Sequence, residues 1–120
     1  AIHDSTTGAD AVDGYYFELD DSVSANWQIC CANNSTRTKT VSGSTPTVNT
    51  WYNLKVVVNS GNTSAEFFVD GASIGTVSTN LPATTRSTGV GIMYSNSAAS
   101  ATSKICSVDL VLVLNRGLTR

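Results

Sequence analysis

The stretch from residue 51 to residue 77, WYNLKVVVNSGNTSAEFFVDGASIGTV, decides the fold of this chain. Apolar residues alternate through 51–58 and again through 64–70, which is the period of a half-buried β-strand. The pair Asp70-Gly71 ends the second run and favours a two-residue hairpin turn, because both positions tolerate positive φ. The stretch therefore predicts three consecutive antiparallel strands, the third over 73–77.

Strand-like runs recur on both sides of this stretch at intervals of about ten residues, with turn residues between them. They cover 14–20, 26–32, 36–41, 88–95 and 104–115. The 36–41 run is polar on both faces, so we expect it at a sheet edge or on a solvated face. No segment has the apolar stripe of an amphipathic helix. The sequence predicts one all-β domain over residues 1–120, an antiparallel two-sheet jelly-roll sandwich of eight strands.

The composition indicates a neutral, polar surface. The chain has 16 Ser, 16 Thr and 10 Asn among 120 residues, and 13% of its residues are charged. The net charge of −2 argues against nucleic acid, which calls for a basic face. No apolar run approaches the ~20 residues of a membrane span, and no signal-peptide pattern opens the chain. Because it starts almost within a strand and without an initiator Met, we expect a fragment of a longer polypeptide.

The cysteines are Cys30, Cys31 and Cys106. Adjacent strand residues point to opposite faces, so only one of the first two could face Cys106. An odd number is a poor disulfide framework, and buried thiols are the preferred interpretation, with one bridge to Cys106 as the alternative. No CxxC pair is present and the single histidine, His3, lies near the start. The sequence therefore predicts neither a metal nor a cofactor.

The run over 104–115 is apolar on both faces. Cys106, Val108, Leu110, Leu112 and Leu114 alternate along one face and are expected in the core. The other face carries Ile105, Val111 and Val113. A strand that is apolar on both faces is buried on both. Either loops of the same chain cover the second face, or another chain does, so these three residues are candidate oligomer contacts.

The stretch from 51 to 77 resembles the middle of concanavalin A-like, laminin-G-like jelly rolls, which carry a Trp, a β-branched strand and an aromatic-Val-Asp-Gly hairpin. GYYFELDD and NWQICC resemble the early strands of that fold, and GVGIMY and SVDLVLVLNRG resemble its late strands. The short form rich in Ser, Thr and Asn is most similar to domains of bacteriophage tail fibres, spikes and other virion appendages. The resemblance implies a homotrimer displayed on the virion surface, near cell-surface glycans of a host.

One motif, Glu18-Leu19-Asp20, suggests catalysis. Glycoside hydrolases of this superfamily carry Glu, an aliphatic residue, Asp and then a second Glu on one strand face, and hydrolysis needs two carboxylates. The next same-face positions here are Ser22 and Ser24, so the second catalytic Glu is missing. No nucleophile-elbow or phosphate-loop motif is present. We therefore expect no enzyme, with a degenerate hydrolase-like domain as one alternative.

Carbohydrate sites combine an aromatic ring, which stacks on sugar C–H faces, with amide and carboxylate partners for hydroxyls. The side chains of these types expected on non-core faces are Tyr16, Glu18, Asn26, Gln28, Lys39, Asn53 and Phe68. Each also has a plain structural interpretation, such as packing under a loop or capping a turn. The sequence and the resemblance together predict a non-catalytic carbohydrate-binding, host-attachment domain. A purely structural trimerisation or capsid-decoration domain is the alternative.

Overall fold

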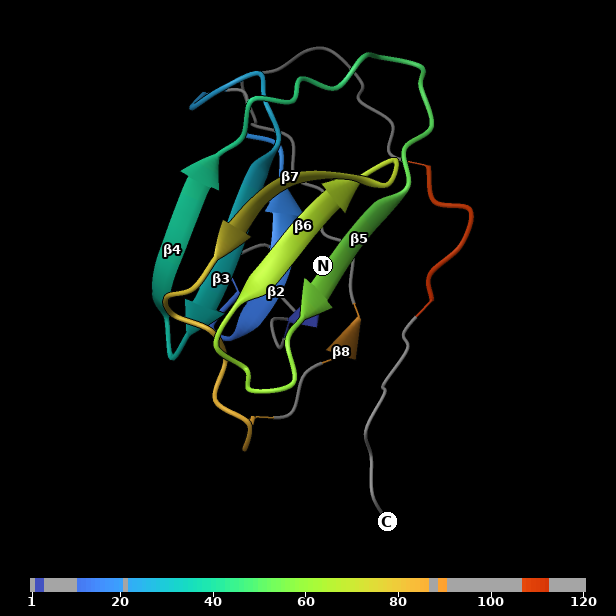
Figure 1. Ribbon diagram of the computed structural model, residues 1–120. Helices are drawn as coiled ribbons and strands as arrows, with labels where there is room; N and C mark the ends of the chain where they lie inside the picture. The colour runs from blue at the N-terminus through green and yellow to red at the C-terminus, as the bar shows by residue number, and fades with distance from the viewer. Residues whose placement is uncertain (1, 4–10, 21, 87–88, 91–106, 113–120) are drawn as a thin grey trace.

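A computed structural model describes residues 2–3, 11–20, 22–86, 89–90 and 107–112 of the chain. All regular secondary structure in these residues is β-strand. The strands form two antiparallel sheets (Figure 1), so the prediction of an all-β antiparallel fold is confirmed. None of the described residues belongs to a helix that is long and apolar enough to cross a membrane.

The larger sheet has the strand order β4-β3-β2-β1-β8, and every neighbouring pair is antiparallel. Its strands are β1 (Ile2–His3), β2 (Gly14–Glu18), β3 (Gln28–Asn33), β4 (Thr36–Val41) and β8 (Gly89–Val90). A turn at Asn34 and Ser35, both with positive φ, joins β3 to β4. The polar strand β4 lies at the edge of the sheet, as predicted, and almost all of its residues are exposed.

The smaller sheet has the order β5-β6-β7 and comes from the stretch with which the sequence analysis began. Its strands are β5 (Leu54–Val58), β6 (Ala65–Val69) and β7 (Ala72–Val77). Asp70 and Gly71 have φ values of 49° and 83°, and Val69 pairs with Ala72 across them. The two-residue hairpin turn with two positive φ angles is therefore confirmed.

The two sheets pack against each other through the core, with the smaller sheet in front in Figure 1. Phe67 of β6 and Ile29 and Cys31 of β3 are essentially inaccessible to solvent and form the centre of this cluster. The Phe17 ring of β2 meets the Phe67 ring edge-on, with centroids 5.2 Å apart. Burial of large apolar side chains, worth about 1.5–3 kcal/mol each, is the main term that holds the layers together.

A β-bulge in β7 brings the sheets close at one point. Phe67 pairs with Gly75 and Phe68 with Ser73, so Ile74 is the extra residue. Gly75 has a φ of 152°, and a Cβ added there would lie 2.7 Å from Cδ1 of Ile29. The bulge therefore depends on glycine for its backbone conformation and for the space above Ile29.

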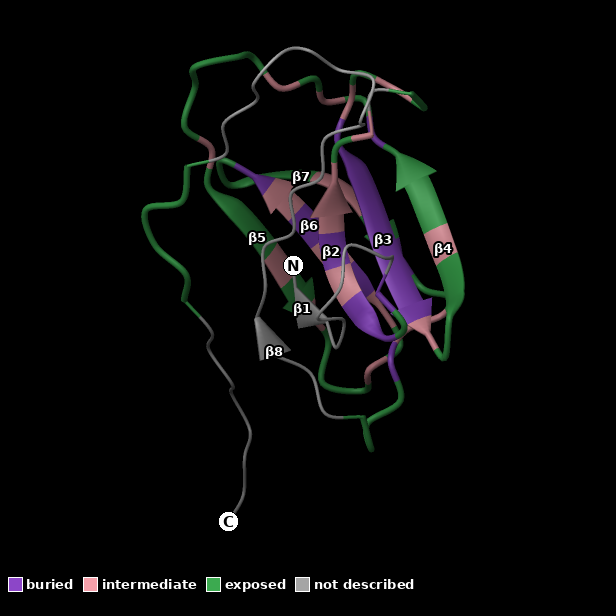
Figure 2. Ribbon diagram, turned by 180° about the vertical axis from the view of Figure 1, so that it is seen from behind, coloured by how far each residue is buried: buried purple, intermediate pink, exposed green. Residues whose placement is uncertain are grey.

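Strand β3 is buried on both of its faces, which the sequence pattern did not predict (Figure 2). Ile29 and Cys31 face the core, as expected. Cys30 and Ala32 point to the opposite face, yet both are fully buried in a second cluster with Ala11 and Tyr16. The larger sheet therefore has an apolar region on the face turned away from the smaller sheet.

The expected strand over 104–115 is not found where the structure describes it. Residues 107–112 have no strand pairing, and all six are exposed. The prediction that Val108, Leu110 and Leu112 fill the core is wrong, because 50%, 77% and 69% of their surface is accessible. Ile105, Cys106, Val113 and Leu114 lie outside the described residues, as does most of the expected strand over 88–95.

Candidate functional site

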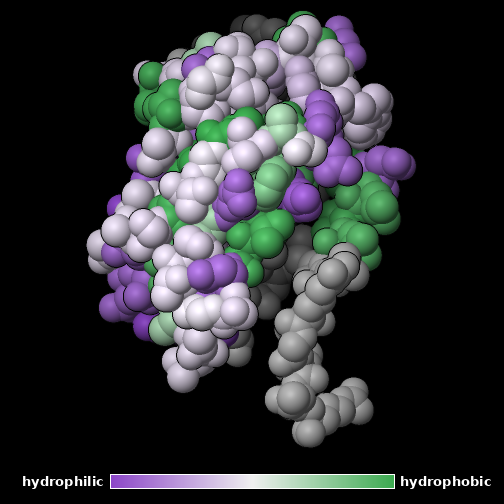
Figure 3. Space-filling model, viewed as in Figure 1, coloured by the Kyte–Doolittle hydropathy of each residue, from purple (hydrophilic) through white to green (hydrophobic). Residues whose placement is uncertain are grey.

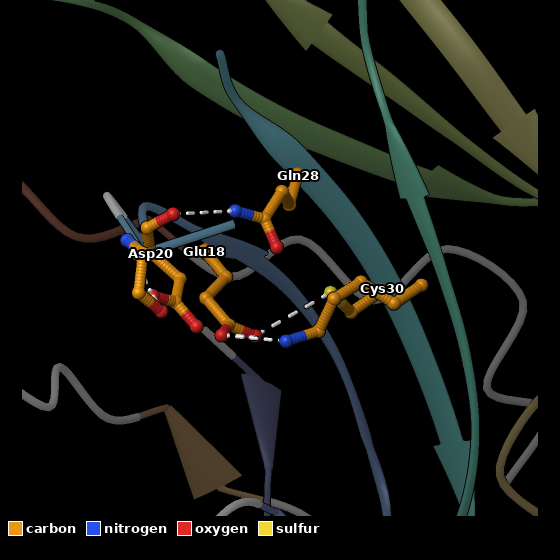
Figure 4. Close-up of polar contacts among 6 residues, drawn as sticks. Glu18, Asp20, Gln28 and Cys30 are labelled. Atoms are coloured by element: carbon orange, nitrogen blue, oxygen red, sulfur yellow. Dashed lines mark hydrogen bonds and ion pairs between the residues drawn. The ribbon is translucent and has the colours of Figure 1, made fainter. Parts of the chain in front are cut away.

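Charged side chains gather on the outer face of the larger sheet, the face turned away from the smaller sheet. Glu18 is the last residue of β2, Cys30 lies within β3 and Lys39 within β4 (Figure 4). The register pairs Cys30 with Lys39 and Glu18 with Gln28, so alternation brings all four to one face. Lys39 Nζ donates to Glu18 Oε1 at 2.7 Å, an ion pair that reaches across β3.

The thiol of Cys30 lies directly under this ion pair. Its Sγ is 3.7 Å from Glu18 Oε2 and donates a weak hydrogen bond to it. Burial, and then the negative charge of Glu18, raise the pKa of Cys30 to about 12. Burial raises the pKa of Cys31 to about 12 as well. Both cysteines are free, so the expectation of buried thiols is confirmed for this pair, and neither has the thiolate character of a nucleophile.

Asp20 and Gln28 form the end of this face next to the turn that follows β2. The carboxylate of Asp20 accepts hydrogen bonds from the backbone N–H and the hydroxyl of Ser22, and these bonds lower its pKa. Gln28 Nε2 donates to the Asp20 carbonyl at 3.2 Å (Figure 4). Gln28 is fully buried, and its Oε1 has no hydrogen-bond partner. These contacts hold the turn against the sheet.

Two of the predicted carbohydrate contacts do not lie at the surface. Tyr16 is 7% exposed and Gln28 is 0% exposed, so neither presents a ring or an amide to a ligand in this structure. Alternation places both side chains opposite the core, as expected, but the outer face is itself covered at these positions. Glu18 and Lys39 do reach the surface, with 22% and 29% of their side chains exposed, and there they pair with each other.

The other three predicted contacts lie elsewhere, and one of them, Asn53, belongs to the loop before β5. Asn26 is engaged in the fold: its Nδ2 donates to the Ser42 carbonyl at 2.8 Å, and its Oδ1 accepts from the Thr45 hydroxyl. Phe68 lies on the outer face of the smaller sheet, with Lys55 Nζ 4.2 Å above the ring centroid. The structure therefore brings together Glu18, Lys39 and the buried Tyr16 and Gln28, but it separates Phe68 from them.

The loop before β5 carries an exposed aromatic residue that the sequence analysis did not select. Trp51 is 67% exposed, and it is the only exposed Trp, Tyr or Phe among the described residues. Val48, in the same loop, is 85% exposed. The neighbouring Tyr52 points the other way, and its ring meets Trp27 edge-on with centroids 5.8 Å apart. The loop crosses the top of Figure 1 and leads into β5.

Specific hydrogen bonds fix the two ends of this loop. The Tyr52 hydroxyl accepts from the Thr47 backbone N–H at 2.7 Å, which closes residues 47–52 into a compact turn. Asn53 and Asp70 bond reciprocally: the Asn53 N–H donates to the Asp70 carboxylate at 2.8 Å, and the Asp70 N–H donates to the Asn53 carbonyl. Trp51 is thus held out into solvent by a rigid support, which is the arrangement of a preformed contact residue.

A signal for Trp51 was present in the sequence. Adjacent residues in an extended segment point to opposite sides, so placing Tyr52 with the apolar face of β5 directs Trp51 away from it. The strand pattern alone did not show that no neighbouring element covers the outward side. Among the described residues, no group of three or more His, Cys, Asp or Glu side chains could hold a metal ion.

The fold and the exposed loop define a small all-β domain of two packed antiparallel sheets, with an aromatic residue presented at the sheet end. A family model described as SO2946-like, C-terminal domain, matches residues 2–109. Since this match covers most of the chain, the chain belongs to that family. No curated protein and no solved structure matches the chain.

Proposed function

We propose that this domain is a non-catalytic carbohydrate-binding domain and that Trp51 is its principal contact. The observation that carries the proposal is a tryptophan residue that is 67% exposed on a loop fixed at both ends by hydrogen bonds. When a ligand covers a large apolar side chain, it removes that side chain from water, and this favours binding. An indole face suits the C–H face of a sugar ring, while hydroxyl and amide side chains nearby recognise sugar hydroxyls.

The loop supplies such polar groups around Trp51. Thr47, Thr50 and Asn53 are exposed in the same segment, and Asp70 lies beside Asn53 in the adjoining hairpin turn. These residues are short, so ordering them on binding costs little side-chain entropy. A rigid loop also loses less freedom when it binds. The site would therefore be polar around one aromatic ring, with the Asp70 carboxylate beside it, which favours a neutral glycan over an anionic ligand.

The wider setting of the proposal rests on the sequence resemblance. We propose a concanavalin A-like jelly-roll connection for the two sheets, supported by the hairpin over β6 and β7 and by the face-to-face packing. The likeness to tail-fibre and spike domains supports display outside the cell on a virion appendage, as a homotrimer that attaches to host glycans. The surface rich in Ser, Thr and Asn suits such a position.

The hydrolase alternative finds less support in the geometry. Glu18 already binds Lys39, and the Asp20 carboxylate already accepts two hydrogen bonds from Ser22. The lowered pKa of Asp20 keeps it ionised at neutral pH, so it cannot donate the proton that glycoside cleavage needs. A structural domain without a ligand remains the second candidate, favoured by the exposed apolar residues 107–112.

The test is binding of the purified chain to an array of bacterial surface oligosaccharides, compared with Trp51→Ala. We expect the wild-type chain to bind a subset of the array and Trp51→Ala to lose that binding at an unchanged melting temperature. Leu19→Ala is the matched control, because Leu19 is also an exposed apolar residue, at 51%, but follows β2 on the other sheet. Undiminished binding by Trp51→Ala would remove this site, and no binding to any sugar would favour the structural candidate.

A further inference from the structure

The outer edge of β5 has no partner strand among the described residues. β5 pairs with β6 on one side only, and it ends the smaller sheet. Its side chains do not protect this edge: Leu54 and Val57 are 41% and 45% exposed, and Lys55 is the one charged residue of the strand. An unpaired edge with apolar side chains is a template for an added strand.

Residues 107–112 have the opposite property, because they carry four exposed apolar side chains and have no strand pairing. Val108, Leu110, Val111 and Leu112 are all at least 50% exposed. Figure 1 shows this segment, in red, separate from both sheets, and Figure 3 shows hydrophobic atoms collected at the same side of the molecule. So much exposed apolar surface in one short segment marks a contact site.

The two elements match in pattern. β5 has Leu54, Val56 and Val58 on the side of the core, separated by Lys55 and Val57 on the outer side. The segment 107–112 repeats this arrangement, with Val108, Leu110 and Leu112 alternating with Asp109 and Val111. Aligned side by side in parallel, the five positions 54–58 meet 108–112, which places Asp109 beside Lys55 and Val111 beside Val57. An opposite-charge pair and an apolar pair would then support the outer face.

We propose that residues 108–112 of a second copy of this chain add as a strand to the free edge of β5. In a single chain this segment lies apart from β5 with its side chains in water, so pairing between copies buries both apolar surfaces. The segment of one copy meets the edge of another, so two copies can exchange segments about a two-fold axis or several copies can form a ring. In either closed assembly every β5 edge and every 108–112 segment is paired. The inference goes beyond carbohydrate binding and does not depend on it.

The test is the solution mass of the full chain, measured by light scattering behind size exclusion. We expect the wild-type chain at two or more times its single-chain mass of 12.6 kDa. Leu110→Lys should give the single-chain mass while the chain stays folded, because Leu110 is 77% exposed in the single chain. Asp109→Lys should shift the mass towards the single chain, and the double variant Lys55→Asp with Asp109→Lys should restore it. Val48→Lys, at an exposed apolar residue of the other loop, is the matched control and should leave the mass unchanged.

Two outcomes would overturn the proposal. A wild-type chain that stays single at high concentration has no such contact. A wild-type oligomer that survives Leu110→Lys uses another surface. If the wild type is single and Leu110→Lys lowers its melting temperature, the segment packs on its own chain instead. None of these results bears on Trp51, because glycan binding is read in a separate assay.

Discussion

Lys39 Nζ lies 2.7 Å from Glu18 Oε1, and the pair reaches from β4 to β2 across the thiol of Cys30. Glu18 is the residue that the hydrolase resemblance would make catalytic. Its oxygens are already occupied by an ammonium group and a thiol, so this face of the larger sheet is stabilised by its charges. The pair is partly exposed, and its contribution to stability is therefore about 1 kcal/mol or less.

The position of Cys30 under this pair gives the first prediction. Glu18→Gln removes the negative charge that helps to raise the pKa of Cys30, while the positive charge of Lys39 remains. We expect the pKa of the Cys30 thiol to fall and its alkylation by iodoacetamide at pH 8.5 to become faster, read by fragment-ion mass spectrometry that separates Cys30 from Cys31. Glu66→Gln, on the smaller sheet, is the control. Equal rates in Glu18→Gln and the wild type would contradict the electrostatic coupling.

The second prediction concerns the bulge in β7. Gly75→Ala would place a methyl group 2.7 Å from Ile29 Cδ1 at a φ of 152°, so we expect a loss of at least about 2 kcal/mol in the free energy of unfolding. Gly43→Ala is the matched control, because nothing lies within 4 Å of its added Cβ, and the change should stay within about 0.5 kcal/mol. Urea unfolding measures both. Equal stabilities of the two variants would show that the sheets separate at this point without cost.

The third prediction concerns the support of Trp51. Tyr52→Phe removes the hydroxyl that accepts the Thr47 N–H bond. Hydrogen bonding with the Thr47 side chain, and then with its backbone N–H, lowers the pKa of Tyr52. We expect weaker glycan binding, with only a small loss of stability in urea unfolding because the bond is exposed to solvent. The Phe ring keeps the edge-on contact with Trp27, so the fold is retained. Full binding by Tyr52→Phe would show that the turn at 47–52 does not position Trp51.

The fourth prediction is a loss of stability at alkaline pH. Burial raises the pKa of Cys30, Cys31 and Tyr15 to about 12, from ordinary values of 9.0 for Cys and 10.0 for Tyr. Each group ionises more readily in the unfolded chain than in the folded one. The contribution of these three neutral groups to the free energy of unfolding is complete below pH 9, and it is lost as the pH rises from 9 towards 12. Urea unfolding between pH 7 and 11 should show this decline.

A matched variant isolates the part that Tyr15 contributes. The Tyr15 hydroxyl donates to Asn62 Oδ1 at 2.6 Å. Tyr15→Phe lowers stability at pH 7 through this lost bond, and its stability should then fall less steeply than that of the wild type above pH 10. Parallel curves for the two proteins would mean that Tyr15 does not titrate differently in the folded and unfolded states.

The sequence predicted the local structure of the β6–β7 hairpin well, for a physical reason. Period-two alternation over Ala65, Phe67 and Val69 determines which side each residue faces, and Asp70-Gly71 determines the turn. Both signals act between near neighbours in the chain. The polar edge strand β4 was readable in the same way, because its composition suits no buried position.

The candidate site was less predictable because exposure depends on segments far apart in the chain. Alternation correctly placed Tyr16 and Gln28 opposite the core, but it could not show that this second face is also buried. The exposure of Trp51 could not be predicted for the same reason. Alternation predicts the side to which its side chain points, but not that no other element covers that side. The bulge at Ile74 was not predicted either, since the run 73–77 has the pattern of a regular strand.

The difference between β4 and β5 affects how this protein behaves at high concentration. β4 carries Arg37 and Lys39 at the border of its sheet, and lysine and arginine in such a place discourage stacking of further molecules. The segment that follows β7 also contacts β4, through the hydrogen bond between the hydroxyls of Thr38 and Thr79. Among the described strands, the edge of β4 carries positive charges while the edge of β5 presents apolar side chains, so we expect an added strand to pair at β5 rather than at β4.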